Sequence, residues 1–385
     1  MQRRHHLSVT LFAVLLAGCV TLDRPGPLPE MPWHLVDGAA LFGTAVDADE
    51  APARDVLEIT PAMQSFVADS VAEGRLSVMR LKRLIRKLDD AGFFARLYTS
   101  TATYTAAETF AHQQGNCLSY TNLFVALARE ARLQVHYQMV DVPPTWDADA
   151  GLLIRNNHIN VVVSGVRFYD SNASTYTVDF NDVDPAPEFT RRRVSDAYAL
   201  SLYYANRSVE LLRAGEDRIA FAHLRRALLI APGNMDLWLN LAAFYSRAGR
   251  TADAVALFAA VERAEPDNRT AQSGLARSYA NLGEQALARQ YEGKVRSYQQ
   301  RNPYYHLAIA QHEYERADYV ASLAAIEQAI ALKRRNARFY FMKALAEDRL
   351  GRAEDARTSL AHARRLGDVS DLARRYLSTL DDLSG

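Results

Sequence analysis

This chain of 385 residues contains few cysteines and has no excess charge of either sign. Lys and Arg total 45 and Asp and Glu total 45, so the formal net charge is zero. Without excess positive charge the chain lacks the basic surface that phosphate backbones require, so we expect no nucleic-acid partner. Two local basic clusters, residues 82–87 and 191–193, are expected to be solvated faces. Because His112, His136 and His158 offer no closely spaced ligand pairs, we expect no metal site and no cofactor.

The apolar run near the N-terminus is too short to cross a bilayer as a helix. A basic segment at residues 3–6 precedes an apolar run over residues 7–16, and small residues then lead to Cys19. Small residues before a cysteine are typical of a cleavage site, and this segment resembles a bacterial lipobox. The resemblance implies removal of residues 1–18 and diacylation of Cys19. Because Val20 follows, where an inner-membrane retention signal has Asp, we expect anchoring in an outer membrane, facing the periplasm.

Only one other cysteine, Cys117, is present in the chain. If Cys19 carries lipid, Cys117 has no partner for an intramolecular disulfide in a compartment where paired thiols oxidise. A lone thiol there favours a reactive role over a structural one.

Cys117 stands at the start of a predicted helix. Apolar residues recur at helical spacing after Asn116, which is a good N-cap. In the first turn, unpaired N–H groups and the helix dipole favour a thiolate, the nucleophilic form of cysteine. Two further helices are predicted, one starting at Thr60-Pro61 and one over residues 77–90.

A proton acceptor for the thiol follows in the predicted strand that carries His158 and a β-branched run. An earlier strand is predicted over residues 135–142, before a loop with Trp146 that could wall a cleft. Two acids compete to orient the imidazole. A tight turn at Ser164-Gly165 would set Asp170 beside the histidine, whereas a longer hairpin loop would make residues 176–181 the returning strand and place Asp179 there.

The stretches 115–117, 123–129, 158–161 and 178–181 together resemble the transglutaminase-like branch of the papain-type thiol enzymes. The resemblance covers roughly residues 60 to 190 and implies a cysteine nucleophile, a histidine base and an orienting acid. It favours Asp179 as the acid, because the residues beside Asp179 match the family better. The oxyanion would be held by the Cys117 backbone N–H together with Gln113 or Gln114.

Residues 201–385 repeat with a period of 34, the spacing between Pro232 and Pro266. The pattern matches the tetratricopeptide (TPR) helix-turn-helix unit, with small residues at the helix crossing and Gly at the turn. Units start at positions 201, 235, 269, 303 and 337, the unit at 303 being the most degenerate, and a helix over residues 370–383 would cap the last unit.

First-helix side chains of such a solenoid face its concave side, which predicts a groove for an extended peptide or a partner helix. The residues predicted to line it are Ser273, Arg277, Tyr304, Leu307, Gln311, Tyr314, Arg338 and Phe341. The alternative is that the aromatic members of this set fill the core of a degenerate repeat.

The predicted architecture is an α+β transglutaminase-like (papain-like) domain followed by an all-α TPR solenoid. A chain of 385 residues is too long for one core. Five prolines make residues 19–55 a tether between the signal segment, 1–18, and the thiol domain, 56–190, and the solenoid then occupies 191–385. We expect a lipid-anchored periplasmic cysteine peptidase, amidase or acyltransferase that acts on peptide or isopeptide bonds and recruits a protein partner through its repeats. The alternative is a non-catalytic envelope scaffold with a degenerate thiol domain.

Overall fold

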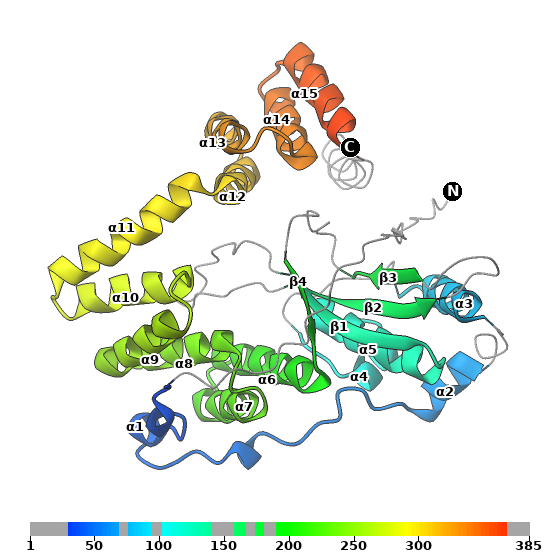
Figure 1. Cartoon of the computed structure of the whole chain (residues 1–385), viewed down its shortest axis with the longest axis horizontal. Helices are drawn as coiled ribbons and strands as arrows, with labels where there is room; N and C mark the ends of the chain where they lie inside the picture. The colour runs from blue at the N-terminus through cyan, green and yellow to red at the C-terminus, as the bar shows by residue number, and fades with distance from the viewer. Residues whose placement is uncertain are drawn as a thin grey trace. The chain divides into compact units, whose positions relative to one another are not determined.

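The computed structural model describes residues 30–68, 76–93, 102–140, 158–166, 174–180 and 190–367. These residues form two compact units, which divide between Leu282 and Gly283 (Figure 1). The first unit holds an antiparallel sheet and the helices up to the middle of the third predicted repeat. The second holds the remaining repeat helices.

Four strands form the sheet, in the order β3-β2-β1-β4. Their bounds are β1 Gln134–Val140, β2 His158–Val166, β3 Ser174–Val178 and β4 Arg191–Val194. β1 and β2 pair from Gln134 opposite Ser164 to Val140 opposite His158. The sequence predicted the first two strands but not β4, because the arginine run looked like a solvated cluster. β4 pairs with β1, so the sheet extends past the boundary predicted at residue 190.

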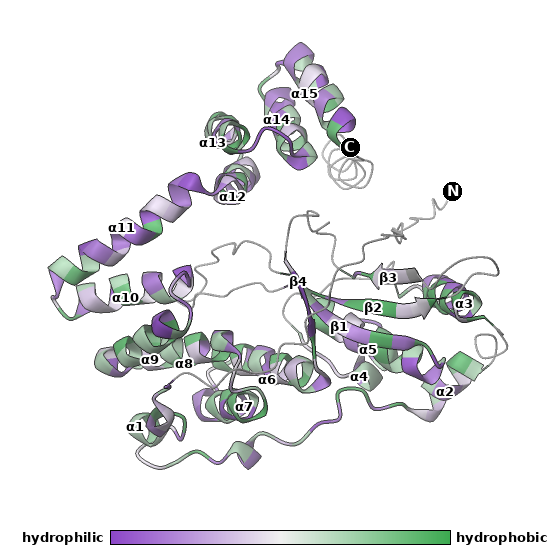
Figure 2. Ribbon diagram, viewed as in Figure 1, coloured by the Kyte–Doolittle hydropathy of each residue, from purple (hydrophilic) through white to green (hydrophobic). Residues whose placement is uncertain are grey.

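Helix α5, Cys117–Glu130, packs on β1 and β2 as the central element of the sheet domain. Figure 2 shows hydrophobic residues along the middle of β2. Leu123, Phe124 and Leu127 of α5 are buried. Across the interface, the Tyr137 hydroxyl donates to Asn122 Oδ1 at 2.8 Å. The buried polar pair therefore fixes the helix against β1 at one defined point.

Three shorter helices complete the lobe around α5: α2 Pro61–Ala68, α3 Ser77–Asp90 and α4 Ala106–His112. α2 begins after Thr60, and α3 occupies the range that the sequence predicted. Leu81, Leu84 and Leu88 of α3 are buried on one face, as its periodicity requires. α4 starts with a capping box, in which Thr105 and Glu108 exchange side-chain and backbone hydrogen bonds.

Residues 30–58 do not form the tether that their prolines predicted. They contain η1 (Trp33–Leu35), α1 (Ala39–Phe42) and η2 (Ala48–Glu50), and they lie on the first repeat helices (Figure 1). We call residues 30–58 the N-terminal strap. Trp33 packs edge-on against Trp238, with ring centroids 4.9 Å apart, and Phe42 packs likewise on Phe221.

Polar contacts also fasten the N-terminal strap. The Tyr245 hydroxyl donates to the Leu35 carbonyl at 2.7 Å, and the Tyr204 hydroxyl donates to the Pro52 carbonyl at 3.0 Å. Arg218 pairs with Glu50 at 2.7 Å. The apolar side chains between the prolines explain the difference from the prediction, because Leu35 and Val46 are buried against the repeats. The signal segment and Cys19 lie outside the described residues.

The repeat helices of the first unit are α6 Asp196–Arg213, α7 Asp217–Ile230, α8 Met235–Arg247, α9 Thr251–Ala264 and α10 Arg269–Asn281. Within the described part of the chain, α6 packs on α7 and α8 packs on α9, as paired repeat helices should. Gly215 and Gly249 occupy the turns with φ of 83° and 73°, a conformation that favours glycine. Ala220 and Ala254, predicted at the close crossings, are fully buried.

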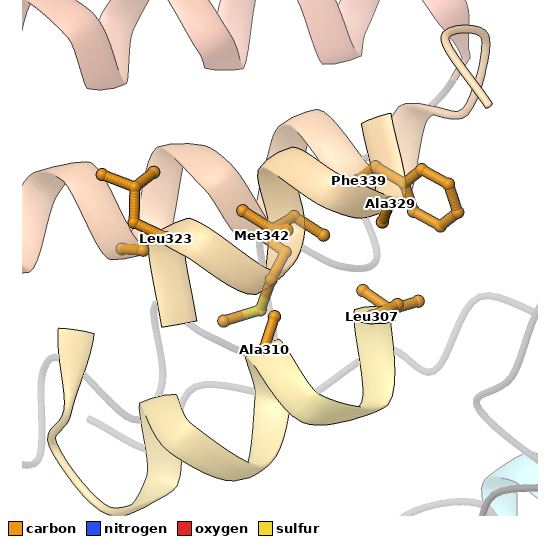
Figure 3. Close-up of a cluster of buried hydrophobic side chains, with 8 residues drawn as sticks. Leu307, Ala310, Leu323, Ala329, Phe339 and Met342 are labelled. Carbon is orange, nitrogen blue, oxygen red and sulfur yellow. The ribbon is translucent and has the colours of Figure 1, made fainter. Parts of the chain in front are cut away.

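The second unit contains α11 Gln285–Arg301, α12 Pro303–Glu315, α13 Tyr319–Leu332, α14 Ala337–Arg349 and α15 Ala353–Leu366. Its core lies between α12, α13 and α14 (Figure 3). The side chains labelled in that view are Leu307, Ala310, Leu323, Ala329, Phe339 and Met342. The predicted capping helix over residues 370–383 lies outside the described residues.

Asparagine caps mark the repeat more regularly than the features that predicted it. Successive repeats begin with an asparagine N-cap, and these caps lie 34 residues apart: Asn234, Asn268, Asn302 and Asn336. Each side chain accepts a hydrogen bond from a backbone N–H in the first helix of its repeat. Each cap satisfies one backbone donor that the helix start leaves unpaired. The helix caps therefore recur with the same period of 34 residues as the packed side chains.

The division between the units falls in the turn of the third predicted repeat, before α11. Only Ala288 is buried among the 17 residues of α11. Glu292 stands where the previous repeat has Phe258, one period of 34 earlier, so α11 lacks the apolar anchor of a second repeat helix. This loss gives a physical reason why the compact units separate at this repeat. No helix among the described residues is long and apolar enough to cross a membrane.

Candidate active site

Cys117 is the first residue of α5, and its side chain is partly exposed. Asn116 caps the helix, its Oδ1 accepting from the Ser119 backbone N–H and from the Ser119 hydroxyl, each at 3.0 Å. The position predicted for the thiol at a helix start is confirmed. Helical N–H groups at this end carry partial positive charge, which favours the thiolate.

A second layer of contacts holds the cap itself. Asn116 Nδ2 donates to Thr103 Oγ1 at 2.7 Å, and the Tyr104 backbone N–H donates to Ser119 Oγ at 2.9 Å. Gly115 has φ of 155°, and a Cβ there would lie 2.5 Å from Ser119 Cβ. A glycine is therefore required beside the cap, which accounts physically for the Gly-Asn-Cys sequence.

His158 and Asp179 lie together at the end of the sheet. The imidazole Nε2 is 2.5 Å from Asp179 Oδ2, with the histidine 3% exposed and the aspartate side chain 23% exposed. Asn160 Nδ2 donates to the same carboxylate oxygen at 3.1 Å. Because side chains alternate along a strand, His158 and Asn160 lie on one side of β2 and share the acid. Sequence reasoning missed Asn160, although its i+2 spacing from the histidine could have indicated it.

The pairing of β2 and β3 brings Asp179 to the histidine. β2 continues through Gly165 to Val166, and Val161 pairs with Val178. The tight turn at Ser164-Gly165 considered from the sequence is therefore wrong. Gly165 instead has φ of 65° beside an irregularity in the pairing between Val163 and Val166. Asp170, the acid that the tight turn would have favoured, lies outside the described residues.

Phe180 connects the acid to the cysteine helix. Its ring stacks on Tyr120 with centroids 6.1 Å apart and tilts against Phe124 at 5.7 Å. Tyr120 lies one turn after Cys117, so the residue next to Asp179 packs over the first turns of α5. The Tyr120 hydroxyl donates to the Gln113 carbonyl at 3.1 Å, which fixes the segment before the helix.

The two glutamines predicted to hold an oxyanion lie between α4 and α5. Gln113 is the C-cap of α4 with φ of 55°, and Gln114 is exposed. Neither side chain has a role assigned by a described contact. Trp146, considered as a cleft wall, lies outside the described residues.

The predicted groove residues divide into core and surface. Leu307 and Phe341 are buried, so their assignment to a groove surface is wrong. Tyr304 packs on Phe339, and its hydroxyl accepts from Lys333 Nζ at 2.8 Å. Tyr314 packs at the edge of the same core.

The polar members of the predicted groove remain nearer the surface. Arg277 is exposed, and Ser273, Gln311 and Arg338 are partly exposed. The aromatic side chains of the degenerate repeat are therefore mainly packing residues, whereas its polar side chains stay accessible. Arg277 belongs to the first compact unit, and Gln311 and Arg338 belong to the second.

Among the residues that the structure describes, no group of three or more His, Cys, Asp and Glu side chains could hold a metal ion. The described chemistry of the candidate site is thus one thiol, one imidazole, one carboxylate and one amide.

Comparison with known proteins identifies the repeats. Residues 211–277 match the tetratricopeptide repeat family. The chain contains TPR repeats. The match spans α7, α8, α9 and most of α10. The predicted unit that starts at position 235 lies at the centre of this match. A search of curated proteins finds no match.

Solved structures similar to parts of the chain share little sequence with it. MamA of strain MSR-1 is 17% identical over 43% of this chain and 95% of that one, with a TM-score of 0.23. MamA from Desulfovibrio magneticus RS-1 is 14% identical over 45% and 96%, with a TM-score of 0.26. A tetratricopeptide repeat protein from Parabacteroides merdae is 19% identical over 44% and 66%, with a TM-score of 0.25. The repeat assignment rests on the family match and on the helix pairs themselves.

Proposed function

We propose that this chain is a thiol enzyme that cleaves or transfers amide acyl groups, with Cys117 as nucleophile, His158 as base and Asp179 as the orienting acid. The observation that carries the proposal is the hydrogen bond of 2.5 Å between His158 Nε2 and Asp179 Oδ2. A carboxylate in that position fixes the tautomer and orientation of an imidazole and stabilises its protonated form. Asn160 supports the same oxygen and keeps it aligned.

The chemistry assigned to these residues is covalent catalysis. Because Asp179 engages Nε2, proton exchange with the sulfur has to use Nδ1. The thiolate attacks the amide carbonyl carbon, and the imidazolium then donates its proton to the departing amine as the C–N bond breaks. Water or a second amine attacks the resulting thioester and releases Cys117. The backbone N–H groups at the start of α5 are the donors for the oxyanion.

The order of elements also supports a transglutaminase-like fold for the first domain. A cysteine helix precedes a histidine strand, and the next strand leads to the acid. The packing of α5 on β2 brings the helix and the histidine strand into one layer pair. Under this proposal, residues 56–190 form the thiol domain, joined directly to the repeats through β4.

Thiol titration tests the enzyme proposal. The rate of Cys117 alkylation by iodoacetamide is measured against pH in the full-length chain and in His158→Gln. An ion pair with the imidazole should lower the thiol pKa well below ~8.5 in the wild type, and His158→Gln should return it toward that value. Two superimposable profiles centred near the ordinary thiol value would exclude the proposed pair.

The family match favours a protein-binding function for the repeats. We propose that they recruit a protein or peptide, which the thiol domain then uses as substrate. A non-catalytic scaffold is the competing function, in which the repeats bind and the thiol domain does no chemistry. Partner binding that persists in Cys117→Ala with no covalent adduct in the wild type would favour the scaffold.

We also propose that Cys19 is lipidated and holds the chain at a bacterial outer membrane, facing the periplasm. The basic segment, apolar run and small residues before Cys19 support this. Two or more acyl chains provide a stable anchor. Mass spectrometry of the N-terminal peptide decides it, since an unmodified Cys19 would exclude the anchor.

A further inference from the structure

A cavity of about 230 Å³ lies within the first unit, and its lining includes none of Cys117, His158 and Asp179. Three parts of the chain meet around it: the end of the N-terminal strap, the segment that leads into α4, and the facing sides of α6 and α7. The residues that carry its chemistry are Arg54, Thr103, Glu108, Tyr203, Arg207 and His223. The cavity is large enough for a small organic molecule.

Two hydrogen-bond donors of the wall have no acceptor in the described part of the chain. Tyr203 is 5% exposed, and its hydroxyl makes no hydrogen bond there. The Arg54 guanidinium likewise makes none, although its backbone N–H donates to the Tyr204 hydroxyl at 2.9 Å. Both side chains line the cavity, so an acceptor bound there would complete their hydrogen bonding.

The other charged side chains of the wall already make described hydrogen bonds. Arg207 forms a hydrogen-bonded ion pair with Glu210, which does not line the cavity. Glu108 accepts from the Thr105 backbone N–H at 2.9 Å and caps α4. Arg54 is therefore the charged side chain of the wall that makes no described hydrogen bond, and a carboxylate is the group with which a guanidinium pairs best.

His223 adds an acceptor. Its Nδ1 lies 2.9 Å from the Ile219 carbonyl, and a carbonyl can only accept, so Nδ1 carries the hydrogen. Burial lowers the pKa of His223, which keeps the ring neutral at pH 7 and leaves a lone pair on Nε2. A ligand that fits the wall therefore combines an anionic acceptor with one N–H or O–H donor.

We propose that this cavity binds a small carboxylate that also carries an N–H or O–H donor close to the carboxyl group. The carboxylate accepts from Arg54 and Tyr203, and the donor meets His223 Nε2. Arg54 comes from the strap, whereas Tyr203 and His223 come from α6 and α7. The site thus forms only when the strap is docked on the repeats, and it stands independently of the thiol chemistry.

N-Acetylglycine and its neutral amide, N-acetylglycinamide, are matched probes, because both carry the N–H and only one carries the charge. Binding to the full-length chain is measured by ligand-observed NMR titration. We expect the carboxylate to bind roughly tenfold or more tightly than the amide, the difference that a charged hydrogen-bond pair makes. Equal binding of both probes would overturn the carboxylate assignment, as would tighter binding of inorganic phosphate.

Variants locate the binding. Arg54→Gln and Tyr203→Phe should each weaken N-acetylglycine binding, by about tenfold and about threefold respectively. Arg247→Gln, which replaces an exposed arginine outside the cavity, should leave it unchanged. Arg54 is exposed, so its replacement should leave the melting temperature near that of wild type. Binding that is unaffected by both cavity substitutions would show that the probe binds elsewhere and would exclude the site.

Discussion

The side-chain amide of Asn116 donates to the hydroxyl of Thr103 at 2.7 Å, so the residue that caps the cysteine helix is itself held by a residue before α4. Thr103 also acts on the Glu210 carboxylate of α6, whose pKa it tends to lower. Burial raises the pKa of Glu210, and Arg207 pairs with its carboxylate. Thr103 therefore lies between the cap of α5 and the first repeat helix, and it influences a group in each.

Thr103→Val should loosen the cap of α5. The substitution leaves the Asn116 amide without its acceptor and should lower the free energy of unfolding by about 1–3 kcal/mol. The alkylation pKa of Cys117 should rise, because the helix start that stabilises the thiolate is less ordered. Thr177→Val on β3 is the matched control. Loss of stability with an unchanged thiol titration would mean that the cap does not tune Cys117.

Asp179→Asn should reduce any amide-cleaving activity by at least about a thousandfold while the chain stays folded, since a neutral amide favours the wrong imidazole tautomer. Combined with Cys117→Ala it should cost little more than either change alone, because the groups act as one unit. The measurement is single-turnover acylation. Asp355→Asn at the start of α15 is the surface control, and equal activity of the two variants would remove Asp179 from the mechanism.

Ala317→Gly should stabilise the second unit. Ala317 has φ of 62° at the turn where Gly249, Gly283 and Gly351 stand in other repeats. A left-handed conformation costs a non-glycine residue roughly 1–2 kcal/mol, of which glycine's greater unfolded freedom offsets part. We expect a gain of about 1 kcal/mol in denaturant unfolding. The reciprocal change, Gly351→Ala, should destabilise, and a destabilising Ala317→Gly would contradict this account of the degenerate turn.

His223 should make stability depend on pH. Burial lowers its folded-state pKa below 6.5, so the unfolded chain binds the proton more readily. Its contribution is fully present above pH 6.5 and is lost as pH falls from 6.5 through the lowered folded-state pKa. His223→Gln should therefore flatten the fall of unfolding free energy in this window. Replacing the exposed His34 by Gln serves as the comparison; an unaltered slope in His223→Gln would disprove the assignment.

Groove binding should depend on polar rather than aromatic side chains. Arg277→Ala, and separately Gln311→Ala with Arg338→Ala, should weaken capture of a peptide partner about tenfold and leave helicity unchanged, because these side chains remain partly or fully exposed. Tyr314→Ala should instead reduce stability, since the ring packs on the second-unit core. A peptide partner is first identified by crosslinking, and its affinity for the wild type and for each variant is then measured. Loss of helicity in the polar variants would identify these residues as structural.

Local signals predicted those parts of the fold that have local causes. Apolar periodicity gave α3 its bounds, the cap residue Asn116 gave α5 its start, and the period of 34 gave the repeats. β4 was not predicted from the sequence, because a run of arginines can be recognised as a strand only once its pairing with β1 is known. The strap was missed for a related reason: prolines suggested a tether, and the surface that buries Leu35 lies some 200 residues later, at Tyr245.

The same distinction applies to the candidate site. Cys117 and His158 could be chosen from their local settings, a capped helix start and an apolar strand. Asp179 depended on the register of β2 with β3, which sequence reasoning left between two alternatives. Asn160 required knowledge that its amide and the imidazole reach one carboxylate oxygen, a relationship that exists only in the folded sheet.

The docked strap has a consequence for the order in which the chain folds. Its hydrogen bonds to the repeats join residues 150 to 210 positions apart. Two segments so distant in sequence meet slowly, because a large loop must close before the contact between them forms. Synthesis proceeds from the N-terminus, so the strap emerges long before α8 exists to receive it. The repeat pairs can fold from local contacts, and the strap must dock on them afterwards, as the last step that completes the first unit.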